Sequence, residues 1–248
     1  MEIKGKNVVI LGATGGIGRA LAFAFAAKGA NLILTGRRKL VLEALKQKLF
    51  DFGVSVKTYK LNVTREKDFV SFARKLKSQI GSIDVLINAF GVGIYKSLED
   101  MNFNDFKKSL DVNLNGVFLS IKYLLPFLEN SKLAYVVSLG SGMGKVGVAK
   151  RLAYCASKFG LRGLMLSLAK EYRNKKIKFC LLTLGSVLTS FGPLTLEEKL
   201  EKQKRGKKYL DPVLLAKTIV SKIENGTLIE ETTIYPKKYF EESKKGLV

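Results

Sequence analysis

Four closely spaced glycines separate a short apolar run from an alanine-rich run near the N-terminus. Residues 8–11 are Val-Val-Ile-Leu and predict a buried strand, while residues 19–28 predict a helix. Between them, Gly12 permits a tight turn, Gly16 lets a ligand approach the backbone, and Gly18 lets the helix pack against the strand. A plain turn is the alternative, since such turns also favour glycine. We interpret the segment as a dinucleotide-binding unit whose helix N-terminus faces phosphate groups.

Strand-like runs alternate with amphipathic stretches of helical length along the rest of the chain. The expected strands cover residues 31–35, 54–61, 85–88, 134–139 and 178–184. This alternation predicts an α/β protein with a Rossmann-type, doubly wound parallel sheet and helices on both faces, in a single domain over residues 1–248. Right-handed crossovers would then bring Gly12, Asn88, Ser141 and Gly185 to one edge of the sheet, where ligands bind.

Tyr154 and Lys158 are spaced so that a helix would place both on one face. A nearby ammonium favours the phenolate form of a tyrosine, so the pair predicts a proton-transfer site. A solvated helix surface is the alternative for such a pair taken alone. The sequence contains no histidine. This excludes Ser-His-Asp and Cys-His triads and histidine metal sites, so we expect no metal and assign acid–base work to Tyr, Lys or carboxylates.

The end of the second expected strand predicts the cofactor. An acidic residue at that point would bind the ribose 2′-hydroxyl and repel a 2′-phosphate, but Gly36 stands there instead. Arg37 and Arg38 follow at once, and guanidinium groups suit bidentate phosphate binding. A solvated loop is the alternative for these arginines. We therefore expect NADP(H) rather than NAD(H).

Motifs spread over nearly the whole chain resemble those of the short-chain dehydrogenase/reductase family. They are residues 12–18, 88–91, 112–114 and 138–141 and the pair Tyr154 and Lys158. Ser141 also precedes Tyr154 at the spacing of that family's catalytic serine. The chain differs from the family at Asn62, where an aspartate commonly meets the adenine; the amide oxygen of Asn62 is expected to accept that hydrogen bond.

The resemblance implies a catalytic set of Asn113, Ser141, Tyr154 and Lys158. Tyr154 would donate a proton to a substrate carbonyl oxygen that Ser141 holds, and Lys158 would lower the pKa of Tyr154 and bind the nicotinamide ribose. Asn113 would orient a water that links Lys158 to solvent, and Asn88 would brace the neighbouring strand. The expected cofactor contacts are Gly12, Thr14, Gly15, Gly16, Ile17, Gly18, Arg37, Arg38, Asn62, Val63, Asn88, Ala89, Tyr154, Lys158, Gly185, Val187 and Thr189.

The same resemblance favours NADP(H)-dependent reduction of a ketone or aldehyde to an alcohol. A 3-oxoacyl-[acyl-carrier-protein] reductase is the alternative, and a protein that binds NADP(H) or nucleic acid without catalysis is the alternative of a different class. Residues 191–208 would form a mobile lid over the substrate, and residues 240–248 a charged tail.

Charge and hydropathy bear on partners and location. The formal net charge is +22. Such a charge attracts anionic ligands, including an anionic or acyl-carrier-linked substrate, but the lysines are too dispersed to predict a nucleic-acid interface. The expected first strand begins within a few residues of the N-terminus and no apolar run spans a bilayer, so we expect a cytoplasmic protein without a membrane partner.

The helix that would carry Tyr154 also predicts self-association. It has more apolar positions than one buried face needs, at Phe159, Leu161, Leu164, Met165 and Leu168. Filling of the protein's own core is the alternative use of these residues. The resemblance implies pairing through this helix and the helix that ends near residue 129, which gives a homodimer or homotetramer.

Overall fold

The computed structural model describes residues 1–236, and the charged tail expected at residues 240–248 lies outside this part. Seven parallel strands form one sheet in the order β3-β2-β1-β4-β5-β6-β7. The chain order reverses between β1 and β4, which opens a crevice at the carboxyl ends of the strands. The strands are β1 (Asn7–Leu11), β2 (Asn31–Gly36), β3 (Val56–Lys60), β4 (Val85–Asn88), β5 (Ala134–Leu139), β6 (Ile177–Leu184) and β7 (Glu231–Ile234).

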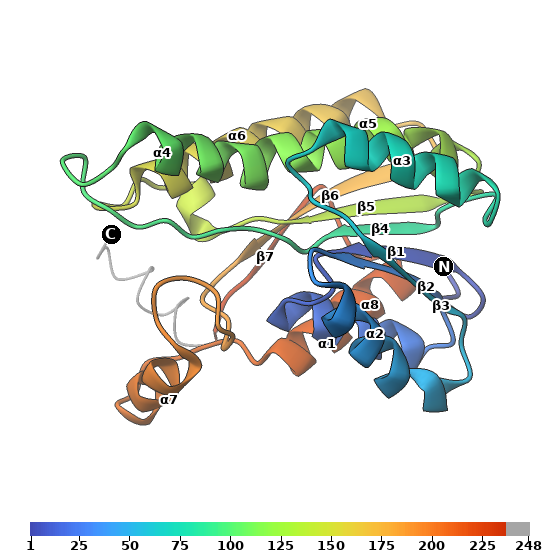
Figure 1. Cartoon of the computed structure of the whole chain (residues 1–248), viewed down its shortest axis with the longest axis horizontal. Helices are drawn as coiled ribbons and strands as arrows, with labels where there is room; N and C mark the ends of the chain where they lie inside the picture. Colours follow the sequence, from blue (N-terminus) through green and yellow to red (C-terminus); the bar gives the residue numbers. More distant parts are fainter. Residues whose placement is uncertain (237–248) are drawn as a thin grey trace.

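Helices cover both faces of this sheet, which confirms the predicted doubly wound fold (Figure 1). One face carries α1 (Gly16–Ala26), α2 (Lys39–Lys48) and α8 (Pro212–Glu224), and the other carries α3 (Glu66–Lys77), α4 (Phe103–Leu110), α5 (Gly116–Glu129) and α6 (Leu152–Glu171). The helix α7 (Leu196–Lys204) lies apart from these layers, at the lower left of the view. Short helical turns are Phe50–Phe52, Gly142–Gly144 and a π-helical turn at Asp111–Asn115.

Two apolar clusters fill the space between the sheet and its helices. Val8 and Ile10 of β1 pack in one cluster, and Val9 and Leu11 pack in the other. Successive strand side chains point to opposite faces, so a strand covered on both sides needs apolar residues at every position. This is why the run at residues 8–11 is apolar without alternation.

Several element boundaries differ from the expectations by one to three residues. The first helix begins at Gly16 rather than at residue 19, because its first turn includes the glycines that face the crevice. The strand β3 is shorter than expected and β6 is longer by one residue. The edge strand β7 was not expected, because its sequence Glu-Thr-Thr-Ile has a single apolar residue.

Two of the apolar residues expected to face a partner subunit belong to the protein's own core. Leu161 and Met165 are 1% and 0% exposed, whereas Phe159 is 44% exposed. Within residues 1–236, no helix has both the length and the apolar composition needed to cross a membrane.

Candidate active site

A pocket of about 1180 Å³ lies along the carboxyl ends of the strands. Its lining residues include the glycine turn after β1 at one end and residues of the helix α6 at the other. Most of the predicted site residues line it: Gly12, Thr14, Gly15, Gly16, Ile17, Arg37, Arg38, Asn62, Val63, Ala89, Ser141, Tyr154, Lys158, Gly185, Val187 and Thr189. Three predicted residues, Gly18, Asn88 and Asn113, are not among its lining residues.

The glycine turn forms a cradle that side chains would fill. Gly12 has a φ of +85°, and a Cβ there would lie 2.9 Å from the carbonyl carbon of Ala89. A Cβ on Gly16 would lie 2.4 Å from a methyl carbon of Thr189. Gly18 lies behind the pocket wall, where a Cβ would be 2.3 Å from the carbonyl oxygen of Gly12. The open backbone and the N-terminus of α1 fit the pyrophosphate of a dinucleotide.

Ser141, Tyr154 and Lys158 converge in the same pocket from two elements. Ser141 begins the short turn after β5, and the first turns of α6 carry Tyr154 and Lys158. Tyr154 and Lys158 are each 5% exposed. The Lys158 ammonium donates a hydrogen bond of 2.8 Å to the Leu139 carbonyl and lies 5.7 Å from the centroid of the Tyr154 ring. A proton donor, a hydroxyl and a buried cation therefore share one site.

Burial sets the protonation of both groups. It raises the pKa of Tyr154, and the nearby Tyr95 adds to this effect, while a hydrogen bond with Ser141 opposes it. Burial lowers the pKa of Lys158 to about 8. The expected lowering of the Tyr154 pKa by Lys158 does not prevail in this structure, because burial dominates and the ammonium is bound to a backbone carbonyl. Tyr154 is thus held in its protonated form.

Asn113 and Asn88 form buried hydrogen bonds behind the pocket. The side chain of Asn113 accepts from the Val92 N–H at 2.8 Å and donates to the Val92 carbonyl and the Ser157 hydroxyl, each at 2.9 Å. Asn113 lies in the π-helical turn Asp111–Asn115, a feature that often marks functional sites. Asn88 donates to Ser138 at 3.0 Å and accepts from Ser120 at 2.8 Å. Asn88 therefore braces β4 against β5 and α5.

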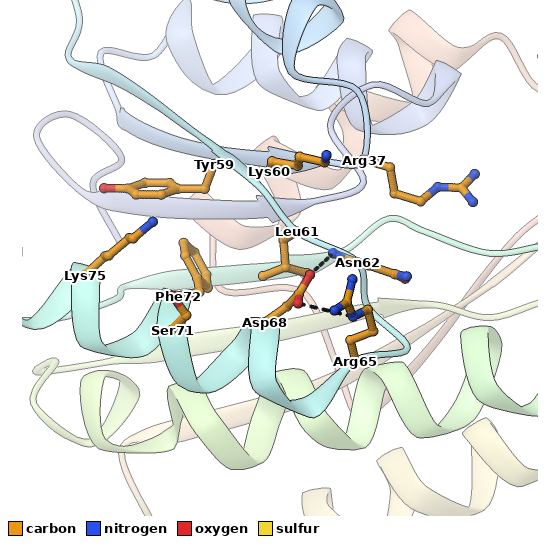
Figure 2. A pocket seen from close by; sticks show the side chains of 10 residues that line it. All are labelled: Arg37, Tyr59, Lys60, Leu61, Asn62, Arg65, Asp68, Ser71, Phe72 and Lys75. Atoms are coloured by element: carbon orange, nitrogen blue, oxygen red, sulfur yellow. Dashed lines mark hydrogen bonds and ion pairs between the residues drawn. The ribbon is translucent and has the colours of Figure 1, made fainter.

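A smaller pocket of about 330 Å³ adjoins the end of β2 (Figure 2). Arg37 lines both pockets, and Lys60, Arg65 and Lys75 add positive charge to the smaller one. Among the described residues, the one carboxylate that lines it is that of Asp68, which accepts a hydrogen bond from the Asn62 N–H at 3.0 Å and lies 3.5 Å from Arg65. The field at this end of the crevice favours an anion.

The side chain of Asn62 points to a different partner than expected. Its amide oxygen accepts hydrogen bonds from the backbone N–H and the hydroxyl of Thr64, at 3.2 and 3.0 Å. These two bonds use both lone pairs of the oxygen. In this conformation the amide nitrogen, and not the oxygen, is the group that Asn62 offers to a ligand.

Two residues that the sequence analysis did not single out also line the pocket. The ammonium of Lys199, on α7, donates hydrogen bonds to the carbonyls of Thr189 and Phe191, and Lys199 as a whole is 7% exposed. Tyr235 packs against the loop that carries Ser141, since a Cβ on Gly142 would lie 2.5 Å from the Tyr235 hydroxyl oxygen. Neither belongs to a motif, and tertiary packing alone brings them to the site.

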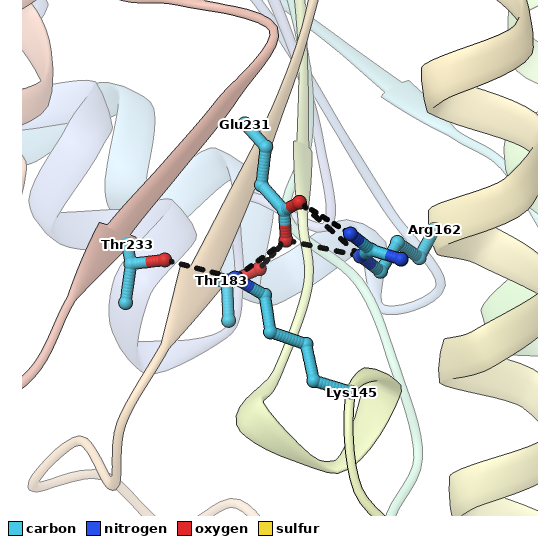
Figure 3. Close-up of polar contacts among 5 residues, drawn as sticks. All are labelled: Lys145, Arg162, Thr183, Glu231 and Thr233. Atoms are coloured by element: carbon cyan, nitrogen blue, oxygen red, sulfur yellow. Dashed lines mark hydrogen bonds and ion pairs between the residues drawn. The ribbon is translucent and has the colours of Figure 1, made fainter.

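A carboxylate on β7 supports the loop that carries Ser141 (Figure 3). Glu231 receives hydrogen bonds from Arg162 of α6, at 2.9 to 3.2 Å, and from Thr183 of β6 at 2.9 Å. Lys145, at the end of the loop, is 3.0 Å from the same carboxylate. Burial alone would raise the pKa of Glu231, but these three partners outweigh it and lower that pKa to about 2.

Replacing Glu231 by Gln should therefore lower the free energy of unfolding at neutral pH by about 2 kcal/mol, because Arg162 and Lys145 lose the partly buried carboxylate that they share. The native carboxyl has a pKa below its ordinary value of 4.5, so its contribution is present above that value and is lost as pH falls towards about 2. Urea unfolding at several pH values should show the parent and variant converging over that interval.

The same substitution at Glu201 serves as the control. Glu201 pairs with Lys204 on an exposed face of α7, where the two side chains are 55% and 73% exposed. Exposed pairs contribute little, so Glu201→Gln should change stability by less than about 0.5 kcal/mol. An equal effect at both positions would show that the Glu231 network does not stabilise the loop.

Comparisons with known proteins agree with this geometry. Residues 6–199 match the short chain dehydrogenase family. Human estradiol 17-beta-dehydrogenase 11 is 30% identical over 237 residues, which cover 94% of this chain and 75% of that protein. The 3-oxoacyl-[acyl-carrier-protein] reductase FabG of Thermotoga maritima is 31% identical over 205 residues, covering 83% and 81% of the two chains.

Two further similarities complete the comparison. The glycine betaine reductase ATRR of Emericella nidulans is 29% identical over 221 residues, and the chain spans only 17% of its length. A structure of the Thermococcus sibiricus alcohol dehydrogenase, complexed with 5-hydroxy-NADP, superposes with a TM-score of 0.81 at 26% identity over 93% of this chain and 96% of that one.

A crevice with a glycine cradle, beside a buried tyrosine and lysine, defines a dinucleotide-dependent oxidoreductase of α/β fold. The chain belongs to the short-chain dehydrogenase family. Its members bind NAD(P), and as an oxidoreductase of that family it acts on alcohol or ketone groups.

Proposed function

We propose that the protein is an NADP(H)-dependent reductase that converts a ketone or an aldehyde to an alcohol. The observation that carries this proposal is the convergence of Ser141, Tyr154 and Lys158 in the pocket that continues into the glycine cradle and reaches Arg37. The residues fit the cofactor, since bare backbone lines the phosphate end and a cation, without an acidic residue, follows β2.

The chain's own residues supply and replace one proton. Bound NADPH supplies the hydride that reaches the carbonyl carbon. The Ser141 hydroxyl donates to the carbonyl oxygen as negative charge develops on it, and Tyr154, held protonated by burial, transfers its O–H proton there. The buried ammonium of Lys158 stabilises the phenolate that remains until solvent returns the proton. Asn113 acts from behind by fixing Val92 and Ser157.

A panel of ketones and aldehydes with NADPH absorbance at constant pH tests this function. Oxidation of NADPH that depends on the carbonyl supports it.

A 3-oxoacyl-[acyl-carrier-protein] reductase is the second candidate, supported by the similarity to the Thermotoga maritima enzyme and by the net charge of +22, which suits an acidic carrier. Preference for carrier-linked over free 3-oxoacyl substrates would select it. NADPH binding without turnover of any carbonyl would favour a non-catalytic binding protein.

We also propose that residues 1–248 act as one domain in which residues 191–208 close over the substrate. The ring of Phe191 lies 6.0 Å from the ring of Tyr154, so this segment already reaches the reacting group. Lys199 ties α7 to the backbone of Thr189 and Phe191.

A cytoplasmic location agrees with the two unpaired, buried cysteines, Cys155 and Cys180.

A homodimer or homotetramer is expected to form through α5 and α6. Phe118 and Phe159 are 47% and 44% exposed on these helices, and burying them would stabilise a contact between subunits. Light scattering should give a mass of at least two chains that persists at high salt, because the contact is apolar. A monomer mass at micromolar concentration would contradict this expectation.

A further inference from the structure

Arg151 brings a positive charge to the substrate side of the pocket. It lies at the N-cap of α6, three residues before Tyr154, and lines the pocket with Tyr154. Its guanidinium carbon is 4.6 Å from the centroid of the Tyr95 ring. The Tyr95 ring in turn packs edge-on against Tyr154, with centroids 5.5 Å apart and planes at 77°. The guanidinium and the proposed proton donor therefore contact the same aromatic ring.

The described part of the fold does not use this charge in an ion pair. Arg65, Arg162 and Arg173 each pair with a carboxylate, whereas within residues 1–236 no carboxylate oxygen lies within 4.0 Å of the nitrogens of Arg151. Its hydrogen-bond acceptor is the Met143 sulfur at 3.4 Å, a weak one. A cation at a helix N-terminus also faces the positive end of the helix dipole. The stacking on Tyr95 orients the group but leaves its donors without a strong acceptor among residues 1–236.

The rest of the pocket does not neutralise it either. Among the described residues that line the pocket, the single carboxylate is Asp111, and Lys107 binds that carboxylate. The surfaces that flank Tyr154 are the rings of Tyr95 and Phe191. The site thus offers aromatic surfaces with a bidentate guanidinium donor beside them.

We propose that Arg151 binds an anionic group, a carboxylate or a phosphate, carried by the carbonyl substrate. This inference rests on the proposed reductase function and assigns its substrate class: a carbonyl compound whose apolar or aromatic body lies against Tyr95 and Phe191 and whose acidic end reaches Arg151. The contact acts mainly on binding, since Arg151 would hold the acidic end of the substrate and not its carbonyl group.

Three probes of matched shape test the assignment with NADPH as reductant. They are 4-carboxybenzaldehyde, its neutral analogue methyl 4-formylbenzoate, and 4-formylphenyl phosphate. The parent should favour at least one charged aldehyde over the ester, and the better of the two tells carboxylate from phosphate. Arg151→Gln should lower kcat/KM for that charged probe by about 10- to 100-fold, chiefly through KM, because a charge-assisted hydrogen-bond pair is lost.

Matched measurements separate recognition from folding and from catalysis. The ester's kcat/KM and the KM for NADPH should change by less than about two-fold in Arg151→Gln, and Arg151→Lys should recover part of the loss through its charge. Arg74→Gln removes the same charge from an exposed face of α3 and should behave as the parent. Calorimetric titration of benzoate, against methyl benzoate, examines the same contact without turnover and should show weaker benzoate binding in Arg151→Gln.

Three outcomes would overturn the proposal. The first is equal loss for the charged and neutral aldehydes, which would make Arg151 a support for Tyr95. The second is a parent that prefers the ester over both charged probes. The third is benzoate binding that Arg151→Gln leaves unchanged. Turnover of the ester by the parent would still uphold the reductase function in each case, whereas benzoate binding without turnover of any aldehyde would reject that function while retaining the anion site.

Discussion

Replacing Tyr154 by phenylalanine should lower carbonyl reduction by about two orders of magnitude or more, because the substitution removes the transferable proton and little else. Phenylalanine keeps the ring that packs at 5.5 Å from Tyr95 and 6.0 Å from Phe191. The protein should therefore fold as the parent does and retain NADPH binding. The loss should appear in kcat, measured from NADPH absorbance at saturating carbonyl.

A second tyrosine provides the control for this change. Tyr172, at the end of α6, packs edge-on against Phe179 with ring centroids 5.0 Å apart and lies outside the pocket. Tyr172→Phe removes the same hydroxyl and should leave kcat within about two-fold of the parent. Turnover by Tyr154→Phe at the parent rate would show that the proton comes from another group and would reject the proposed role of Tyr154.

Burial explains which parts of the fold the sequence could predict. The central strands β1, β4 and β5 are covered on both faces and are mostly apolar, so apolar runs such as residues 8–11 predict them. The edge strand β7 is stabilised by pairing with β6 and by the contacts of Glu231 with Arg162 and Lys145. Those contacts join residues far apart in the chain, and no local pattern encodes them.

The same distinction applies to the site. Motif spacing predicted that Ser141, Tyr154 and Lys158 belong together, because a helix and one strand end fix their relative positions. The predicted lowering of the Tyr154 pKa was wrong, since the shift depends on burial and on Tyr95, and the motif spacing contains no information about either. The hydrogen bonds of the Asn62 amide oxygen with Thr64 and of the Lys199 ammonium with Thr189 likewise depend on neighbours that only the folded chain supplies.

Arg37 should determine cofactor preference. It follows β2 directly, its side chain is exposed, and within the described residues it makes no ion pair that would compete with a phosphate. It also lies between the two pockets, where Lys60 and Arg65 strengthen the positive field. A 2′-phosphate would be held there by charge-assisted hydrogen bonds, which NADH cannot form.

Replacing Arg37 by Asp should weaken NADPH binding by about 100-fold or more and NADH binding by less than about five-fold. The reason is that a guanidinium that would bind the 2′-phosphate is replaced by a carboxylate that would repel it. Fluorescence titration of each cofactor at fixed ionic strength measures both constants. Lys39→Asp makes the same change of charge two residues away, outside the lining of either pocket, and should affect both cofactors by a similarly small factor. Equal losses of NADPH and NADH binding in Arg37→Asp would mean that Arg37 shapes the adenosine end without reading the phosphate, and selection of NADP(H) would then fall to Arg38.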